Sequence, residues 1–347
     1  MLALVRYREH LTTALHAHHP APPKPIRNQD EPLLRTCLRR ALRRKDAGYV
    51  FGAASALLDR DPRKLWKEIA AIALKNFALA DLSLFGSVIA AASSKSWRDK
   101  RGGDWHIASY LLLGLLNTPC DRRLRKLQLA ARNSHTDAHE MLGFVIAEAA
   151  KIISRCEKRV PYPALVAISA SECDNALEEM SAHHALDEGL IEVCKQARRT
   201  TQSILPVLLP LAMTAAYGGT QARIRRKAPE TRDIGGLPSY VFDASTQIGH
   251  RALNMWMKEA PEIGRMITAI PSMQSQVTLR DEALFAVEGG VCVDEVSDAF
   301  YRELSTASMK GHDDAPDALV MELRAAMRSA IPLLNDIREF VHVSKAG

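Results

Sequence analysis

The sequence has few aromatic residues, 5% of 347, and few runs of β-branched residues, while alanine and leucine are plentiful. This composition favours helices, and an apolar fraction of 47% is enough for a substantial core. A long hydrophobic run is also missing. The most apolar stretch, residues 204–217, is too short to span a bilayer and predicts a buried helix kinked near Pro210. The sequence therefore predicts an all-α protein, a multi-helix array or bundle, with no membrane partner.

Closely paired cysteines are absent. None of the six cysteines forms a C-x-x-C pair, and their spacings match no metal site. Reduced thiols of a cytoplasmic protein are the expectation. Residues 1–19 form an amphipathic segment that carries Arg6, Arg8 and Glu9 and lacks the continuous apolar core of a signal peptide.

Catalytic signatures are absent as well. No G-x-x-x-x-G-K-[ST] motif occurs, since none of the Gly-Gly pairs precedes a Lys-Ser or Lys-Thr step. Spacing alone assigns no Ser-His-Asp or Cys-His arrangement. The sequence therefore predicts no cofactor, and no catalytic residue is assigned.

Composition shifts along the chain suggest four parts. A proline-rich linker at residues 20–32 follows the first helix. We expect an N-terminal helical arm with its linker at 1–30 and a helical domain at 31–217. A loop rich in Gly, Pro and Arg at 218–241 should then lead to a smaller C-terminal helical region at 242–347.

The most informative stretch predicts three helices with short joints, at 33–44, 50–58 and 62–79. Asp61 is placed to cap the third helix, and Pro62 suits its first position. One face of that helix carries apolar residues at helical spacing, namely Leu65, Ile69, Ile72, Ala73 and Phe77.

Residues 31–131 resemble the helical region that follows the ATPase core in the replication-associated recombination ATPases of the MgsA/RarA type, which are clamp-loader relatives. That family has a basic K-S-x-R-x-x-D segment, an Ala-rich helix, a G-x-D-P-R turn and a helix ending near L-A-D. The matching residues here are Arg43, Arg44, Lys45 and Asp46, then Ala53 to Leu58, Asp61-Pro62-Arg63, Leu65, Ile69, Ala73 and Leu79-Ala80-Asp81.

The chain also departs from this family. Lys75-Asn76 replaces its acidic pair, and the ATPase module is absent. In the family this region assembles subunits and contacts partner proteins. The resemblance implies a clamp-loader-collar-like segment in a self-associating scaffold or accessory protein of DNA replication, recombination or repair, with replication or repair proteins as partners.

Clusters of basic residues are the candidate nucleic-acid contacts, because guanidinium groups bind phosphates in a forked geometry. Each cluster could instead be an ordinary solvated face. A further cluster around Arg98 is flanked by Trp97 and Trp105, which could stack on bases. The candidate DNA-binding residues are Arg39, Arg40, Arg43, Arg44, Arg122, Arg123, Arg125, Lys126, Arg223, Arg225, Arg226 and Lys227.

Two alternative functions remain open. Asp243 and His250 flank the start of a helix and could serve an enzyme acting on nucleic acid or a nucleotide, with a site at 235–251, although an N-capping Asp or Ser is the simpler explanation of this segment. The second alternative function is that of a protein–protein adaptor of a mobile element or phage.

A metal site is a weaker possibility. His135 and His139 are spaced to share a helical face and could bind a metal, but a helix start with acidic residues also explains that segment.

Overall fold

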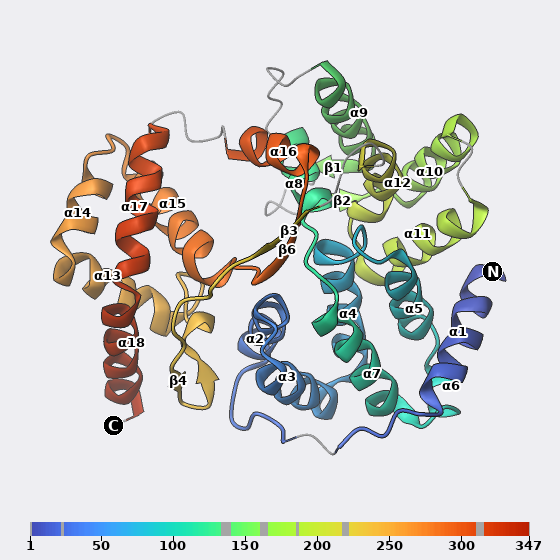
Figure 1. Cartoon of the computed structure of the whole chain (residues 1–347), viewed down its shortest axis with the longest axis horizontal. Helices are drawn as coiled ribbons and strands as arrows, with labels where there is room; N and C mark the ends of the chain where they lie inside the picture. The colour runs from blue at the N-terminus through green and yellow to red at the C-terminus, as the bar shows by residue number, and fades with distance from the viewer. Residues whose placement is uncertain are drawn as a thin grey trace. The chain divides into compact units, whose positions relative to one another are not determined.

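The computed structural model in Figure 1 describes residues 2–21, 24–132, 140–159, 166–184, 187–216, 222–309 and 316–346. Within these residues the fold is all-α, with 75% of them in helices and only small two-stranded sheets, which confirms the expected fold class. No helix in these ranges combines the length and apolar character needed to cross a membrane.

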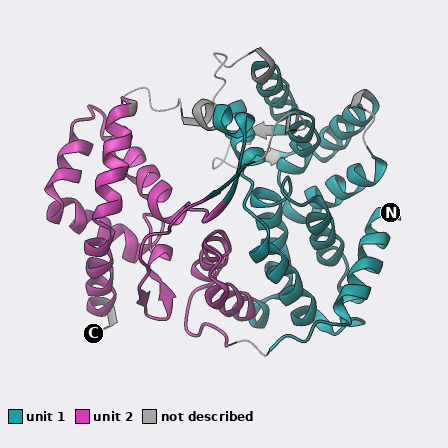
Figure 2. Cartoon of the chain, in the orientation of Figure 1, with its two compact units in different colours: residues 1–22, 58–224, 295–310 teal, residues 23–57, 225–294, 311–347 magenta. Residues whose placement is uncertain are grey.

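The chain forms two compact units, each assembled from three separate stretches, as Figure 2 shows by colour. Unit 1 comprises residues 1–22, 58–224 and 295–310, and unit 2 comprises residues 23–57, 225–294 and 311–347. This division differs from the four consecutive parts that the sequence suggests. The helices at 31–57 join the C-terminal helices, because their buried side chains find partners there.

Unit 1 is a helical array with short strands. Helices α4, α5 and α7 have fully buried residues such as Ile69, Ile89 and Leu111. Its helices are α1 (Leu2–Leu15), α4 (Pro62–Asn76), α5 (Leu82–Ala92), α6 (Lys95–Asp99), α7 (Gly103–Asn117), α8 (Arg123–Arg132), α9 (Glu140–Cys156), α10 (Ala170–His184), α11 (Glu188–Thr201), α12 (Leu205–Ala216) and α16 (Ala299–Met309). Its strands β1 (Glu157–Arg159) and β2 (Val166–Ile168) pair antiparallel, and β3 (Ala222–Arg225) pairs with β6 (Asp294–Ser297).

Helix α1 packs on α5 in unit 1, whereas the sequence predicted a separate arm. Leu4, Leu11 and Leu15 are buried, as their spacing on one helical face dictates. Gly86 of α5 permits the close approach, because a Cβ there would lie 2.3 Å from the Tyr7 ring.

Helix α4 begins as the sequence predicts. The Asp61 side chain accepts a hydrogen bond from the Arg63 backbone N–H at 2.9 Å, and Pro62 occupies the first turn. Leu65, Ile69 and the other apolar residues expected on one face are buried. Helix α12 contains Pro210 and is buried along most of its length, as expected for the apolar stretch.

Unit 2 has a core formed mainly by its C-terminal helices, in which Trp256, Leu323 and Leu334 are fully buried. Helix α13 packs on α18, and α17 packs on α14 and α15. The elements are α2 (Glu31–Arg44), most of α3 (Ala47–Arg60), β4 (Asp233–Ile234), β5 (Leu237–Pro238), the 3₁₀ turn η1 (Ser239–Val241), α13 (Gln247–Glu259), α14 (Pro261–Thr268), α15 (Met273–Leu284), the π-helical turn η2 (Phe285–Gly289), α17 (Asp317–Ser329) and α18 (Ile331–Ala346).

The expected loop at 218–241 contains a small hairpin. Strands β4 and β5 are joined by Gly235 and Gly236, with φ of 61° and 84°. Two consecutive positive φ angles suit a two-residue hairpin turn, and glycine adopts them without strain. The hairpin leads directly into the turn η1, in which Ser239, Tyr240 and Val241 are all buried.

Candidate functional site

The arginines of α2 differ in their exposure. Arg40 and Arg44 are 5% and 9% exposed, while Arg39 and Arg43 are partly exposed. Helical periodicity explains the difference, because the buried stripe of α2 runs through Cys37 and Ala41 and reaches Arg44 one turn later.

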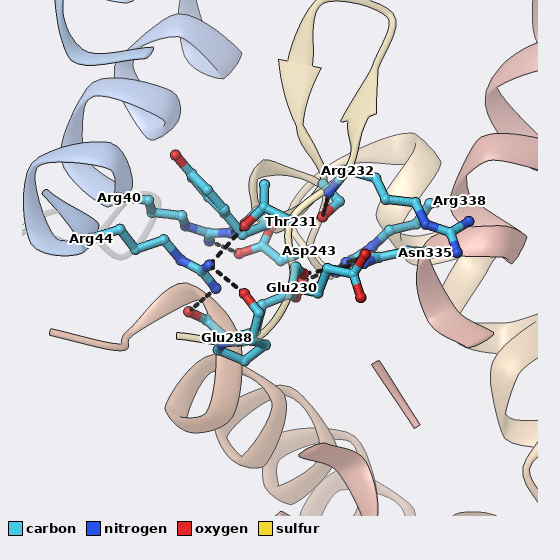
Figure 3. Close-up of polar contacts among 12 residues, drawn as sticks. Arg40, Arg44, Glu230, Thr231, Arg232, Asp243, Glu288, Asn335 and Arg338 are labelled. Atoms are coloured by element: carbon cyan, nitrogen blue, oxygen red, sulfur yellow. Dashed lines mark hydrogen bonds and ion pairs between the residues drawn. The ribbon is translucent and has the colours of Figure 1, made fainter. Parts of the chain in front are cut away.

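Arg44 points into unit 2, where its guanidinium has neutral oxygen partners (Figure 3). It donates to Thr231 Oγ1 at 3.0 Å, to the Glu288 carbonyl at 3.0 Å and to the Pro229 carbonyl at 3.3 Å. The same group lies 4.2 Å from the Tyr240 ring centroid, in a cation–π contact. Burial lowers the pKa of Arg44, and the nearby Glu288 offsets part of that effect.

Arg40 binds the start of the segment leading into α13. Its guanidinium donates to the Tyr240 carbonyl and forms an ion pair with Asp243. Burial alone would raise the pKa of Asp243, but Arg40 and the hydrogen bonds from Ser245 lower it below its ordinary value. Asp243 is therefore ionised in the folded protein, and its ion pair with Arg40 holds α2 against the segment that leads into α13.

A buried ion pair lies beside these arginines in unit 2. Both guanidinium Nη atoms of Arg338 bind the two carboxylate oxygens of Glu288, at 2.7 and 2.8 Å. Arg338 also donates to Asn335 Oδ1 at 3.0 Å. The side chains of Arg338 and Glu288 are 0% and 2% exposed, so this bidentate pair is a structural element of unit 2.

The basic cluster at the start of α8 is also occupied by internal partners, all within unit 1. Arg123 is 1% exposed, donates to Asp121 at 2.6 Å and forms a second ion pair with Asp298. Burial alone would lower the pKa of Arg123, but these two carboxylates raise it. Arg122 contacts Glu295 at 2.5 Å and Tyr301 Oη at 3.2 Å.

The remaining two residues of this cluster lie at intermediate depth. The ammonium of Lys126 lies 4.5 Å from the Tyr301 ring centroid, and Arg125 donates to Gln128 Oε1 at 2.5 Å. Burial lowers the pKa of Arg125, with a smaller contribution from Arg132. The basic residues of the α8 cluster therefore contact other residues of unit 1, and they offer little positive surface to a ligand.

The basic segment at 223–227 has the opposite character, since Arg223, Arg225, Arg226 and Lys227 are all exposed. Ile224, between the first two arginines, is partly buried. Because side chains alternate along a strand, Arg223 and Arg225 of β3 share the face opposite Ile224. The backbone N–H of Arg226 donates to the Val293 carbonyl at 2.9 Å, which extends the pairing beyond β3. We call residues 223–227 the exposed basic segment.

These contacts correct part of the expected DNA-binding set. Arg40, Arg44 and Arg123 are buried and bound to carboxylates, carbonyls or a hydroxyl of the same unit, so they are not available to phosphates. Desolvating a charge is costly unless it is paired, which explains why each of these arginines has several partners within its unit. The sequence could not reveal those partners, since Arg44 and Glu288 are 244 residues apart.

The two weak catalytic candidates, Asp243 and His250, have different partners. Asp243 is bound to Arg40 and Ser245, whereas the exposed His250 lies near the Asn254 amide, 3.5 Å away. His135 and His139 lie outside the described residues. Within the described ranges, no group of three or more His, Cys, Asp or Glu side chains is arranged to hold a metal ion.

Comparison of the chain with protein-family models, with curated proteins and with solved structures found no match.

Proposed function

We propose that this protein binds the phosphate backbone of DNA through the exposed basic segment at 223–227. In this proposal it acts as a non-enzymatic, self-associating accessory protein of replication, recombination or repair. The single observation that supports it most directly is the exposure of all four basic side chains of that segment.

The geometry of the exposed basic segment suits a repeating anion. Arg223 and Arg225 project from the same face of β3, two residues apart, and the backbone pairing of β3 with β6 holds that spacing. Guanidinium groups bind phosphate oxygens in a bidentate fashion, and such contacts carry no sequence preference. The expected ligand is therefore DNA of any sequence.

The accessory role rests on the resemblance of residues 31–131 to the region that assembles subunits in the recombination ATPases. The capped start of α4 at Asp61-Pro62-Arg63 is consistent with the turn expected there. Light scattering after size exclusion, with and without DNA, measures the predicted self-association.

Fluorescence anisotropy with single-stranded and double-stranded DNA at two salt concentrations tests the DNA contact. The variant Arg223→Glu/Arg225→Glu/Arg226→Glu should bind DNA at least about 100-fold more weakly at low salt, because three phosphate contacts become repulsive. Its unfolding temperature should stay near that of the wild type, since all three side chains are exposed.

The matched control is Arg251→Glu/Lys258→Glu/Arg265→Glu, which changes the net charge equally at exposed positions of α13 and α14. It should retain most of the affinity. Equal losses in both variants would show that only net charge matters. No binding of wild type at low salt would reject the proposal and favour the adaptor alternative.

A further inference from the structure

A basic pocket of about 770 Å³ lies in unit 1, where α3 ends and α4 begins. The ends of α5 and α11 and the short helix α6 complete its walls. Among the described residues, its lining includes five basic side chains and one acidic one, Asp61. The basic residues are Arg60, Arg63, Lys67, Lys95 and Arg98.

The inner wall of this pocket is fixed by a buried arginine. Arg98 is 3% exposed, and its guanidinium lies 4.6 Å from the centroid of the buried Trp66 ring. Asp104 accepts hydrogen bonds from both residues, at 2.5 Å from Arg98 Nε and 2.7 Å from Trp66 Nε1. Arg98 also donates to the carbonyls of Ala91 and Ala92, so its guanidinium is held by partners within the fold.

The rim carries the other four cations, all on exposed side chains. Arg63 is 90% exposed and only 3.5 Å from the Asp61 carboxylate, which already caps α4. Lys67 donates to the neutral amide oxygen of Gln202 at 2.7 Å, and Lys95 forms a surface ion pair with Asp99. Neutral or solvated partners such as these are weak competitors for an incoming dianion.

The N-terminus of α4 adds an electrostatic field that favours an anion in the pocket. The helix macrodipole places partial positive charge at its N-terminus, in the same pocket as the four rim cations. The pocket volume lies in the range of small-molecule sites and matches a nucleotide better than a long strand. The charge of the pocket, its size and an inner wall held by hydrogen bonds together favour a ligand with a terminal phosphate.

We propose that this pocket is a second anion site, separate from the exposed basic segment, which binds a terminal phosphate monoester or polyphosphate. Arg63 and Lys67 contact the phosphate oxygens from the rim. The phosphate group is the recognised chemistry, and its source is either a free nucleotide or the 5′ end of a DNA strand.

Calorimetric titration of the full chain with pyrophosphate and with ATP, without added metal, tests this site, with adenosine as the ligand control. The variant Arg63→Glu/Lys67→Glu should bind both phosphates at least about tenfold more weakly, because two charge-assisted contacts are reversed. Arg63 and Lys67 are exposed, so thermal unfolding should change little.

The matched control is Lys64→Glu/Lys75→Glu, which reverses two exposed lysines of the same helix that do not line the pocket. It should bind like the wild type. Equal weakening in both variants, or no binding of pyrophosphate and ATP to the wild type, would overturn the proposal.

Anisotropy with 5′-phosphorylated and 5′-hydroxyl oligonucleotides separates the two phosphate sources. A preference for the phosphorylated strand that disappears in Arg63→Glu/Lys67→Glu identifies a strand end. No preference, with pyrophosphate and ATP still bound, identifies a free nucleotide. Binding of the 5′-hydroxyl strand reports only on the exposed basic segment, so the two proposals can fail independently.

Discussion

Two arginine-rich segments of this protein look alike in sequence but differ in structure. Residues 39–44 read RRALRR and belong to α2, while residues 223–227 read RIRRK and begin in the strand β3. Two of the four arginines in the first segment are buried against unit 2, whereas every basic residue of the second is exposed. A run of positive charge therefore does not by itself identify a binding surface.

The difference follows from the local period of each segment. A helix turns a new residue toward its buried side every three or four positions, so a dense run of arginines must place some of them inside. In the short strand β3 alternate residues face apart, and Ile224 occupies the inward position. Buried arginines then need fixed partners, which makes them structural.

The largest effect is expected from the buried ion pair of unit 2. Arg338→Met should reduce the free energy of unfolding by about 3–5 kcal/mol, because the carboxylate of Glu288 loses both of its bidentate contacts. Urea unfolding followed by circular dichroism measures the change. The double variant Glu288→Leu/Arg338→Met should recover much of the loss. A single variant as stable as the wild type would contradict the structural role of buried arginines.

A smaller difference in the free energy of unfolding is expected between variants of two arginines in α2, Arg44 and Arg35. Arg44→Met should cost about 1–3 kcal/mol, because it leaves the Glu288 and Pro229 carbonyls and the Thr231 hydroxyl without its hydrogen bonds. Arg35→Met should change the free energy by less than about 0.5 kcal/mol, since its pair with Glu31 is long, at 3.8 Å, and partly exposed. Urea unfolding measures both variants. Equal losses of stability would contradict the difference between the buried and the partly exposed arginines of α2.

Part of this pattern was predictable from sequence. The helical class, the capped start of α4 and its buried face follow from local propensity and spacing, which depend on neighbouring residues only. The stripe through Cys37 and Ala41 could also have marked Arg44 as inward-facing, because the three positions fall on one helical face.

The long-range arrangement was not predictable in the same way. The two units interleave three stretches of chain each, and local periodicity contains no information on which stretches pack together. The acidic partner of Arg123 at Asp298 lies 175 residues away. Likewise, the five cations of the basic pocket come from three helices whose proximity only the fold establishes.

Acid should reveal the paired carboxylate beside Arg40. The folded-state pKa of Asp243 lies below its unfolded value of 3.8, so its contribution to stability is complete above that pH and is lost as pH falls through the folded value. Asp243→Asn should therefore be less stable than the wild type by about 1 kcal/mol at neutral pH. This difference in stability between the variant and the wild type should disappear as the pH falls below 3.8. Urea unfolding at a series of pH values measures it, and a difference that stays constant with pH would contradict the ion pair.

The smallest effect is expected from a single arginine of the exposed basic segment. Arg225→Gln should leave the free energy of unfolding within about 0.5 kcal/mol of the wild type, because the side chain is exposed. If Arg225 contacts one phosphate, the slope of log affinity against log salt on duplex DNA should fall by about 0.9. Anisotropy titrations at several salt concentrations measure that slope, and Arg251→Gln should leave it unchanged. A loss of stability with an unchanged slope would mean that this segment, like α2, uses its arginines within the fold.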